Sequence, residues 1–218
     1  MHGILRLGVI LSFLVLLLGP SRAFGLTDPA PPILTSSTIL VLSDCLAEAY
    51  GFDPDQSWVL LLSKRLSDQQ WPYQVVNISN SGDTTQQGLE KLPEALKQYH
   101  PALVIVALGS NDGLRGFPTP FIYENLSQIT ALIQGYPAKI LLVRLGLPTN
   151  YGPVYQKQFS SIFDRLEERY HLSNSMILID AISSQAQNKQ FDNLHPSAEA
   201  QQVILDALWP AIKRNLRP

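Results

Sequence analysis

The chain has 218 residues, of which 45% are hydrophobic and 16% are charged, and this length suits one domain with a single continuous core. Sixteen Lys and Arg residues nearly balance 18 Asp and Glu residues, which argues against a nucleic-acid binder because such a protein needs a basic surface. The single cysteine, Cys45, excludes an internal disulfide and a zinc site built from cysteines. Cys45 is therefore a core filler, an interchain linker or a reactive thiol.

Residues 1–23 are typical of an export signal. Arg6 precedes an apolar run over residues 9–18, which is shorter than the roughly 20 residues that a membrane-spanning helix needs. Ser21 and Ala23 place small side chains where a signal peptidase would cleave, and an uncleaved N-terminal anchor is the alternative. We therefore expect an exported protein, periplasmic or secreted, with no stable membrane span after cleavage.

The Pro-, Ser- and Thr-rich residues 24–37 lack a hydrophobic period and are predicted to be a linker, so the folded domain covers residues 38–218. Within the domain, short apolar runs predict strands and apolar residues at helical spacing predict helices. The predicted strands are 38–43, 73–79, 102–108, 139–145 and 176–180. The predicted helical stripes cover 58–66, 89–96, 122–133, 159–166 and 196–212.

Two details of the helix starts are also predicted. Asp83 and Gln86 have the spacing of a capping box, and Pro196 suits the first position of the last helix. Strands separated by helices call for a parallel sheet with right-handed crossovers. We therefore predict an α/β fold: a three-layer α/β/α sandwich with a five-stranded parallel sheet and flavodoxin-like topology. In such a fold the site lies beyond the carboxyl ends of the strands.

Four polar clusters lie after predicted strands, and they supply candidates for acyl-transfer chemistry. The clusters are Ser43–Cys45, Ser81–Thr84, Gly109–Asp112 and Asp192–Pro196. Acyl transfer requires a nucleophile, a base, an acidic residue that orients the base, and donors for the developing oxyanion. Cys45 is the nucleophile candidate, because a helix N-terminus after the first strand would lower the pKa of its thiol.

His195 is the base candidate by elimination, since the other histidines lie in the signal segment or near helix ends. Asp192, three residues earlier, could hold one ring nitrogen and free the other. Gly82 suits a backbone N–H close to a ligand, and Asn111 could add a side-chain donor. Taken separately, a plain turn and an ordinary loop asparagine remain the alternative interpretations of these two residues.

The sequence gives little support for a metal or a nucleotide cofactor. His195 has no second histidine near it, and the carboxylates do not cluster at ligand spacing. No Gly-rich run separates the first strand from its helix, so a phosphate-binding loop is not expected. We therefore predict no cofactor.

The four clusters, in their order and spacing, resemble those of the SGNH, or GDSL-type, hydrolases. The chain is most similar to the subgroup of arylesterase, acyl-CoA thioesterase I and lysophospholipase L1 enzymes. The resemblance covers residues 38–218 and extends beyond the clusters. The additional matching segments are Gly88–Leu89, Leu92–Pro93, Asn111–Gly116, Asn150–Pro153 and His195–Gln201.

The resemblance implies roles for individual residues. Asp192 and His195 would be the catalytic acid and base, and Cys45 would occupy the nucleophile position. The oxyanion hole would consist of Gly82, Asn111 and the backbone N–H of Cys45. The acyl pocket would be shaped by stretches that include Thr84, Asn150 and Tyr151. The implied partner is a small-molecule acyl ester or a lysolipid, and we expect a monomer.

The chain departs from the family in the first cluster, which is Gly-Asp-Ser in the family and Ser43-Asp44-Cys45 here. Ser43 lies two residues earlier on the strand, so we do not expect it to replace the missing serine. Because a thiol ionises more readily than an alcohol, Cys45 and His195 could rest as a thiolate–imidazolium pair. Sulfur is larger than oxygen, however, so reduced activity is expected.

Two classes of function follow. The first is hydrolysis of carboxylic esters or thioesters with small to medium acyl chains through an acyl-enzyme, with acyl transfer to an alcohol or amine as a variant. The second is a catalytically impaired family member that binds an acylated ligand or partner. A low-pKa thiol in an oxidising compartment would also make activity sensitive to peroxide.

Overall fold

The computed structural model describes residues 37–172, 176–177, 189–190, 192 and 195–216. The chain divides into two compact units, residues 1–34 and 35–218, and the described residues all belong to the second. The predicted signal and nearly all of the predicted linker therefore lie outside the described residues. None of the helices in the described part combines the length and the apolar character needed to cross a bilayer.

A parallel five-stranded sheet forms the centre of the second unit, with strand order β2-β1-β3-β4-β5. Its strands are β1 Thr38–Ser43, β2 Gln74–Asn77, β3 Leu103–Ala107, β4 Lys139–Arg144 and β5 Met176–Ile177. The predicted fold class is confirmed, and only Met176–Ile177 of β5 lie among the described residues. Residues 178–180, predicted to continue it, lie outside the described residues.

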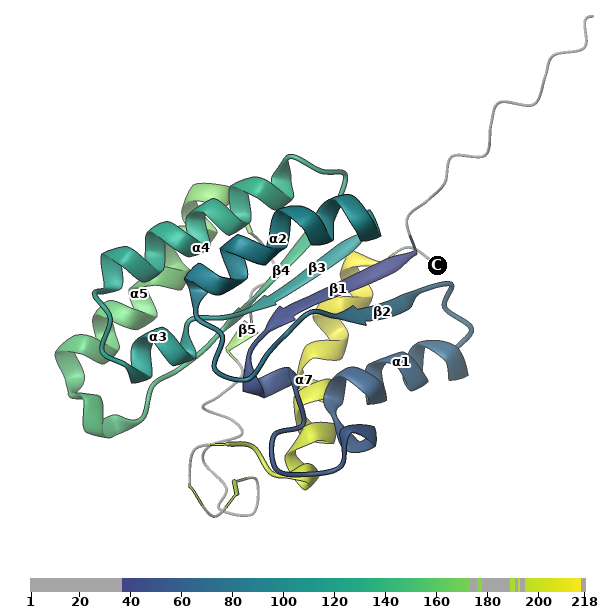
Figure 1. The fold of residues 1–218 in the computed structure, drawn as a ribbon, viewed down its shortest axis with the longest axis horizontal. Coiled ribbons are helices and arrows are strands. Elements are labelled where there is room, and N and C mark those ends of the chain that lie inside the picture. Colours follow the sequence, from purple (N-terminus) through teal and green to yellow (C-terminus); the bar gives the residue numbers. More distant parts are fainter. Residues whose placement is uncertain (1–36, 173–175, 178–188, 191, 193–194, 217–218) are drawn as a thin grey trace, which may run out of the picture. The chain divides into compact units, whose positions relative to one another are not determined.

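Helices cover both faces of this sheet (Figure 1). The helices are α1 Trp58–Asp68, α2 Thr85–Tyr99, α3 Ser110–Leu114, α4 Thr119–Gln134, α5 Pro153–Tyr170 and α7 Ala198–Asn215. Helices α2, α4 and α5 lie on one face, and α1 and α7 lie together on the other. The short 3₁₀ helices in the described part of the chain are η1 Cys45–Ala47, η2 Pro54–Gln56 and η3 Thr149–Tyr151.

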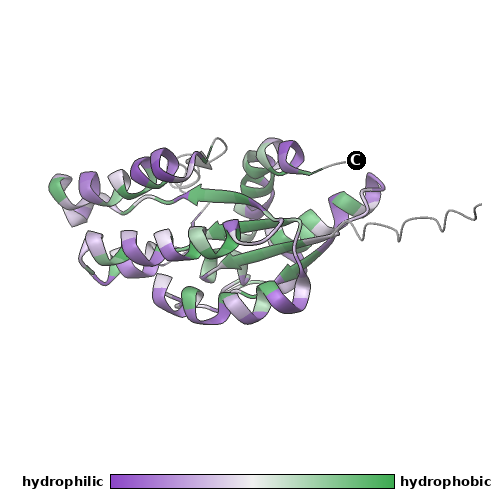
Figure 2. Cartoon of the chain, turned by 90° about the horizontal axis from the view of Figure 1, so that it is seen from above, coloured by the Kyte–Doolittle hydropathy of each residue, from purple (hydrophilic) through white to green (hydrophobic). Residues whose placement is uncertain are grey.

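The core lies on both sides of β1 and β3, because helices cover each face. Every residue of β1 and β3 is buried, which explains why these strands are apolar throughout instead of alternating. The helices contribute one stripe each and present their polar sides to solvent (Figure 2). The carboxyl end of β1, where Cys45 follows, is thereby fixed by a rigid, fully covered strand.

The capping box of α2 lies one residue later than predicted. Thr84 is the N-cap and exchanges hydrogen bonds with Gln87, the third residue of the helix. Asp83 instead accepts a hydrogen bond from the Asn80 N–H at 2.9 Å and pairs with Lys91. The prediction for Asp83 and Gln86 was wrong because this carboxylate is engaged in the loop that precedes the helix.

The last helix also begins later than predicted, at Ala198 with Ser197 as N-cap. Pro196 lies before it and forms an antiparallel bridge with Lys189. This bridge keeps the proline in extended conformation, so it cannot start the helix. Val203, predicted in the apolar stripe, is 41% exposed, whereas Ile204 beside it is buried.

Candidate active site

Cys45 is the first residue of η1, directly after β1. Asp44 is the N-cap of this short helix, and its Oδ1 accepts a hydrogen bond from the Leu46 N–H at 3.0 Å. The Leu46 carbonyl in turn accepts from the indole N–H of Trp58, a fully buried side chain, at 2.9 Å. The turn that carries Cys45 is therefore held from both sides.

Ser43 does not compete with Cys45 as a nucleophile in this structure. Its hydroxyl is completely buried and donates to the Ala107 carbonyl at 3.0 Å, while its N–H donates to the Ser79 hydroxyl at 2.9 Å. The side chain that replaces the family's glycine is thus directed into the sheet, where its polar atoms are satisfied.

Asp44 is the centre of a buried network around the candidate nucleophile. Its Oδ2 accepts hydrogen bonds from the Ser110 hydroxyl and, at 3.1 Å, from the Asn111 side-chain amide. The Cys45 thiol lies 3.8 Å from its Oδ1, a weak S–H···O contact. Burial raises the pKa of the Asp44 carboxyl, and the hydrogen bonds from Ser110 and the Leu46 backbone oppose that effect.

The pKa of the Cys45 thiol is raised to about 12, first by burial and then by the negative charge of Asp44, with a smaller contribution from Glu48. The prediction of a resting thiolate–imidazolium pair was therefore wrong. The physical reason is that η1 has only three residues, so its dipole is small beside two neighbouring carboxylates. The thiol is protonated at neutral pH and requires a base.

The two candidate oxyanion segments lie against each other and against the Cys45 turn. Gly82 has φ +84°, a conformation that favours glycine, and its carbonyl accepts from the Arg115 guanidinium at 3.1 Å. The Asn111 side-chain amide donates to Asp44 and, at 3.1 Å, to the Asp83 carbonyl next to Gly82. Both hydrogens of this amide are therefore engaged in the structure.

Asp192 and His195, the candidate acid and base, lie within hydrogen-bond distance of each other. Asp192 Oδ2 lies 2.6 Å from His195 Nδ1, and its Oδ1 accepts from the His195 N–H at 3.0 Å. The His195 side chain is 18% exposed. Its ring packs on that of Tyr50, five residues after Cys45, with centroids 4.4 Å apart. Bonding at Nδ1 leaves Nε2 free to accept a proton.

The residues implied to bind substrate are in three different situations. Thr84 is buried, and its hydroxyl is used as the N-cap of α2. Tyr151 donates its hydroxyl to the Leu114 carbonyl at 2.7 Å, which joins the loop after β4 to α3. Asn150 is exposed, and its neighbour Thr149 contributes to the wall of a cavity.

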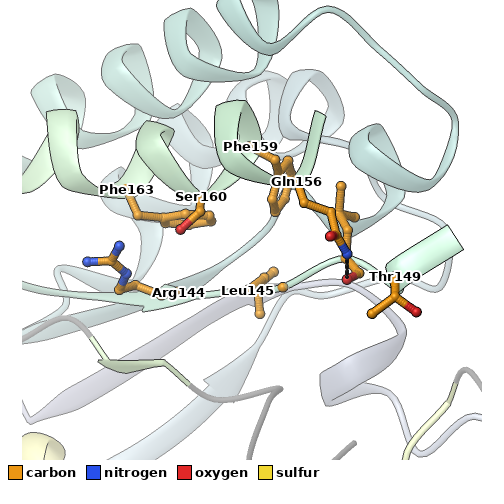
Figure 3. Close-up of a pocket in the computed structure, with 9 residues that line it drawn as sticks. Arg144, Leu145, Thr149, Gln156, Phe159, Ser160 and Phe163 are labelled. Carbon is orange, nitrogen blue, oxygen red and sulfur yellow. Dashed lines mark hydrogen bonds between the residues drawn. The ribbon is translucent and has the colours of Figure 1, made fainter. Parts of the chain in front are cut away.

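This cavity, about 310 Å³ in volume, lies between the end of β4 and α5 (Figure 3). Its lining consists of Arg144, Leu145, Gly146, Leu147, Thr149, Gln156, Phe159, Ser160 and Phe163. An added Cβ at Gly113 would lie 2.6 Å from Leu147 and 2.9 Å from Phe159. Since Gly113 belongs to α3, which carries Asn111, the cavity adjoins the candidate oxyanion segment.

Sequence reasoning missed several residues that build this site. Ser110 lies in a predicted cluster but was given no role, and Glu48, whose carboxylate accepts from the Ser81 N–H, belongs to none. Tyr50 and Gln190 also escaped notice because their contacts join segments 140 residues apart. Among the described residues, no group of three His, Cys, Asp or Glu side chains could hold a metal ion.

Comparisons with known proteins identify the family of the chain. Residues 44–203 match the GDSL-like Lipase/Acylhydrolase family. The chain is 38% identical to the esterase TesA of Pseudomonas aeruginosa, over 82% of this chain and 89% of that protein. It is 37% identical to thioesterase 1/protease 1/lysophospholipase L1 of Escherichia coli, over 84% and 85%.

Among solved structures, the psychrotrophic esterase EstA from Pseudoalteromonas, inhibited by monoethylphosphonate, superimposes with a TM-score of 0.78 and 36% identity. The match covers 82% of this chain and 97% of that one. The family model spans the Cys45 turn, the oxyanion segments and the Asp192–His195 pair. The chain therefore belongs to the GDSL-like lipase/acylhydrolase family, a family of enzymes.

Proposed function

We propose that the protein hydrolyses carboxylic esters or thioesters with small to medium acyl chains, using Cys45, His195 and Asp192. The observation that carries this proposal is the 2.6 Å hydrogen bond between Asp192 and His195, together with the packing of His195 on Tyr50. It brings an oriented base to the segment that begins with Cys45. The names of the relatives, which include an esterase and a thioesterase, support the same class of reaction.

The first half of the reaction forms an acyl-enzyme. His195 Nε2 takes the thiol proton, and the sulfur attacks the substrate carbonyl carbon, whose π electrons move to oxygen. The oxyanion is bound by the N–H groups of Gly82 and Cys45 and by the Asn111 amide, which exchanges one present acceptor for it. The intermediate expels the alcohol or thiol, which takes the proton from His195, and a thioester remains.

The second half returns the enzyme to its starting state. Water gives a proton to His195 and adds to the thioester carbonyl, and collapse of the second intermediate breaks the C–S bond. The sulfur recovers its proton from His195. Asp192 remains ionised and stabilises the imidazolium in both halves. Because the Cys45 thiol has a raised pKa, each step depends on this base.

The size of the cavity beside α3 supports the proposal that the acyl chains are short. At about 310 Å³ it lies at the lower end of the range of roughly 300–1,000 Å³ for small-molecule pockets. Leu145, Leu147, Phe159 and Phe163 give it an apolar wall. Arg144, at its edge, is neutralised by Asp164 and Glu167 of α5, so the cavity presents no free charge from this residue.

The test is turnover of p-nitrophenyl acetate and butyrate by the parent protein, Cys45→Ala, Cys45→Ser and His195→Ala. We expect turnover by the parent to be lost in Cys45→Ala and His195→Ala, and Cys45→Ser to be at least as active as the parent. Intact-mass spectrometry should detect an acyl group on residue 45. Equal turnover in the parent and Cys45→Ala would exclude Cys45 as the nucleophile.

Binding of an acylated ligand without turnover is the second candidate function. Two observations favour it: the raised pKa of the thiol, and the engagement of both Asn111 amide hydrogens. It predicts saturable binding of an acyl ligand with no release of p-nitrophenol. Transfer of the acyl group to an amine or alcohol, the third outcome, would appear as an acylated acceptor in the same assay.

We also propose export, based on residues 1–23, with the acyl substrate met outside the cytoplasm. Cell fractionation of the full chain and of a version without these residues tests this proposal. We expect the full chain outside the cytoplasm and the shortened chain inside. The expected oligomeric state is a monomer, which light scattering would measure on the same preparations.

A further inference from the structure

The candidate base and the candidate nucleophile are far apart in sequence, and the described contacts between their segments involve few side chains. Gln190 makes one of these contacts and also binds the backbone on either side of the His195–Pro196 peptide. Its side-chain amide donates to the Tyr50 carbonyl and, at 3.0 Å, to the Pro196 carbonyl. Its own backbone N–H donates to the His195 carbonyl at 2.9 Å.

We propose that Gln190 is a positioning residue, which holds the Asp192–His195 pair against the segment that follows Cys45. The proposal rests on the proposed function and extends it to a residue that touches neither substrate nor reacting atoms. The amide nitrogen of Gln190 donates to both segments, to the Pro196 carbonyl beside His195 and to the Tyr50 carbonyl. The rings of Tyr50 and His195 meet within the same assembly, with centroids 4.4 Å apart.

The backbone opposite Gln190 is built for this contact. Gly51 has φ +82°, and an added Cβ there would lie 2.4 Å from Gln190 Oε1. A side chain at position 51 would therefore displace the Gln190 amide as well as strain the turn. Gly51 therefore leaves room for the Gln190 amide at this place.

The chemical consequence follows from the needs of proton transfer. Asp192 fixes the orientation of the His195 ring. It does not fix the position of the ring relative to Cys45, because Asp192 and His195 belong to the same segment. Gln190 supplies that second constraint. A misplacement of about 1 Å between reacting groups can cost on the order of a hundredfold in rate.

The experiment compares Gln190→Met, which keeps the length of the side chain and removes its hydrogen bonds, with Gln202→Met as the matched control. Gln202 donates to Asp206 on the surface of α7. Three quantities are measured: kcat and KM for p-nitrophenyl butyrate, and the rate of Cys45 alkylation by iodoacetamide. Gly51→Ala and the Gly51→Ala/Gln190→Met double variant complete a cycle.

We expect Gln190→Met to lower kcat by about 10- to 100-fold with KM little changed, and to slow alkylation toward the rate of His195→Ala. The double variant should lose less than the product of the two single effects, because both act through one contact. Unchanged or faster alkylation in Gln190→Met would overturn the proposal, since loosened packing alone exposes the thiol. If His195→Ala itself kept the turnover of the parent, that result would instead refute the proposed function.

Discussion

At the scale of single residues, Asp44 shapes the environment of Cys45, the candidate nucleophile. Its buried carboxylate accepts from Ser110, Asn111 and the Leu46 backbone, so it organises the turn and the neighbouring α3. The same negative charge raises the pKa of the Cys45 thiol next to it. Replacing serine by cysteine in this environment therefore does not produce the reactive thiolate that is typical of cysteine enzymes.

The rate at which Cys45 is alkylated in the native protein tests the raised pKa of its thiol. The iodoacetamide reaction of Cys45 should be slow at pH 7 and should accelerate as the pH rises toward the thiol pKa of about 12. Glu48→Gln removes one negative charge and keeps an acceptor for the Ser81 N–H, so it should speed the reaction modestly. Glu90→Gln on the exposed side of α2 is the control. Full alkylation within minutes at pH 7 would contradict the raised pKa.

A sulfur nucleophile also selects among leaving groups. In the tetrahedral intermediate the thiolate leaves more readily than an alkoxide, so alkyl esters mainly revert to substrate. We expect the parent to prefer thioesters and phenyl esters to the matched ethyl ester by at least about tenfold. In Cys45→Ser the preference should shrink, because serine and the alkyl alcohol leave about equally well. An identical preference in both proteins would show that the rate of acylation does not depend on which group, the nucleophile or the alcohol, leaves the tetrahedral intermediate.

At the scale of the elements, α3 connects the candidate oxyanion segment to the cavity beside α5. Asn111 lies on one side of this five-residue helix, while Gly113 on the other packs directly on Leu147 and Phe159. Tyr151 and Tyr155 donate hydrogen bonds to carbonyls at and just after its end, those of Leu114 and Phe117. The loop after β4 and the start of α5 thereby set both the cavity and the position of α3.

Filling the cavity from α5 should change chain-length preference without removing the chemistry. Ser160→Phe places a ring at the cavity wall (Figure 3), so we expect butyrate turnover to fall about tenfold more than acetate turnover. Ser161→Phe, on the same helix but outside the cavity lining, is the matched control. Equal losses for both esters would place the acyl chain elsewhere. The measurement is kcat/KM for the two p-nitrophenyl esters.

At the scale of the whole molecule, the raised thiol pKa couples the site to stability. The folded protein keeps the Cys45 proton up to a pKa of about 12, whereas the unfolded chain releases it near the ordinary thiol value of 9.0. The unfolded state therefore binds fewer protons within this window. The contribution of this thiol to the free energy of unfolding is fully present below pH 9 and is lost as the pH rises toward 12.

Urea unfolding at pH 8 and pH 10.5 tests this coupling. The parent should lose more free energy of unfolding between the two pH values than Cys45→Ser, by at most about 1.4 kcal/mol per pH unit. Tyr and Lys residues also titrate in this range, but they are common to both proteins and cancel in the comparison. A parent and a serine variant with parallel pH profiles would show that the thiol is not shielded in the folded state.

The sequence by itself determined the layered fold, because apolar runs and helical stripes report directly which faces are buried. β1 was predicted at its observed bounds, and Asp192 and His195 are close enough along the chain to be recognised as a pair. Contacts between distant segments were not predictable, since no local pattern records them. Only the tertiary structure places Gln190 against Tyr50 and Gly51, and Glu48 against Ser81.

The protonation state of Cys45 was also decided by the tertiary structure and not by the local sequence. From the sequence, a strand followed by a helix predicted a lowered thiol pKa, because the helix was expected to be long enough to carry a dipole. The structure ends that helix after three residues and buries Asp44 beside the sulfur. A pKa depends on burial and on charges within a few ångströms, and these follow from how all the segments pack together.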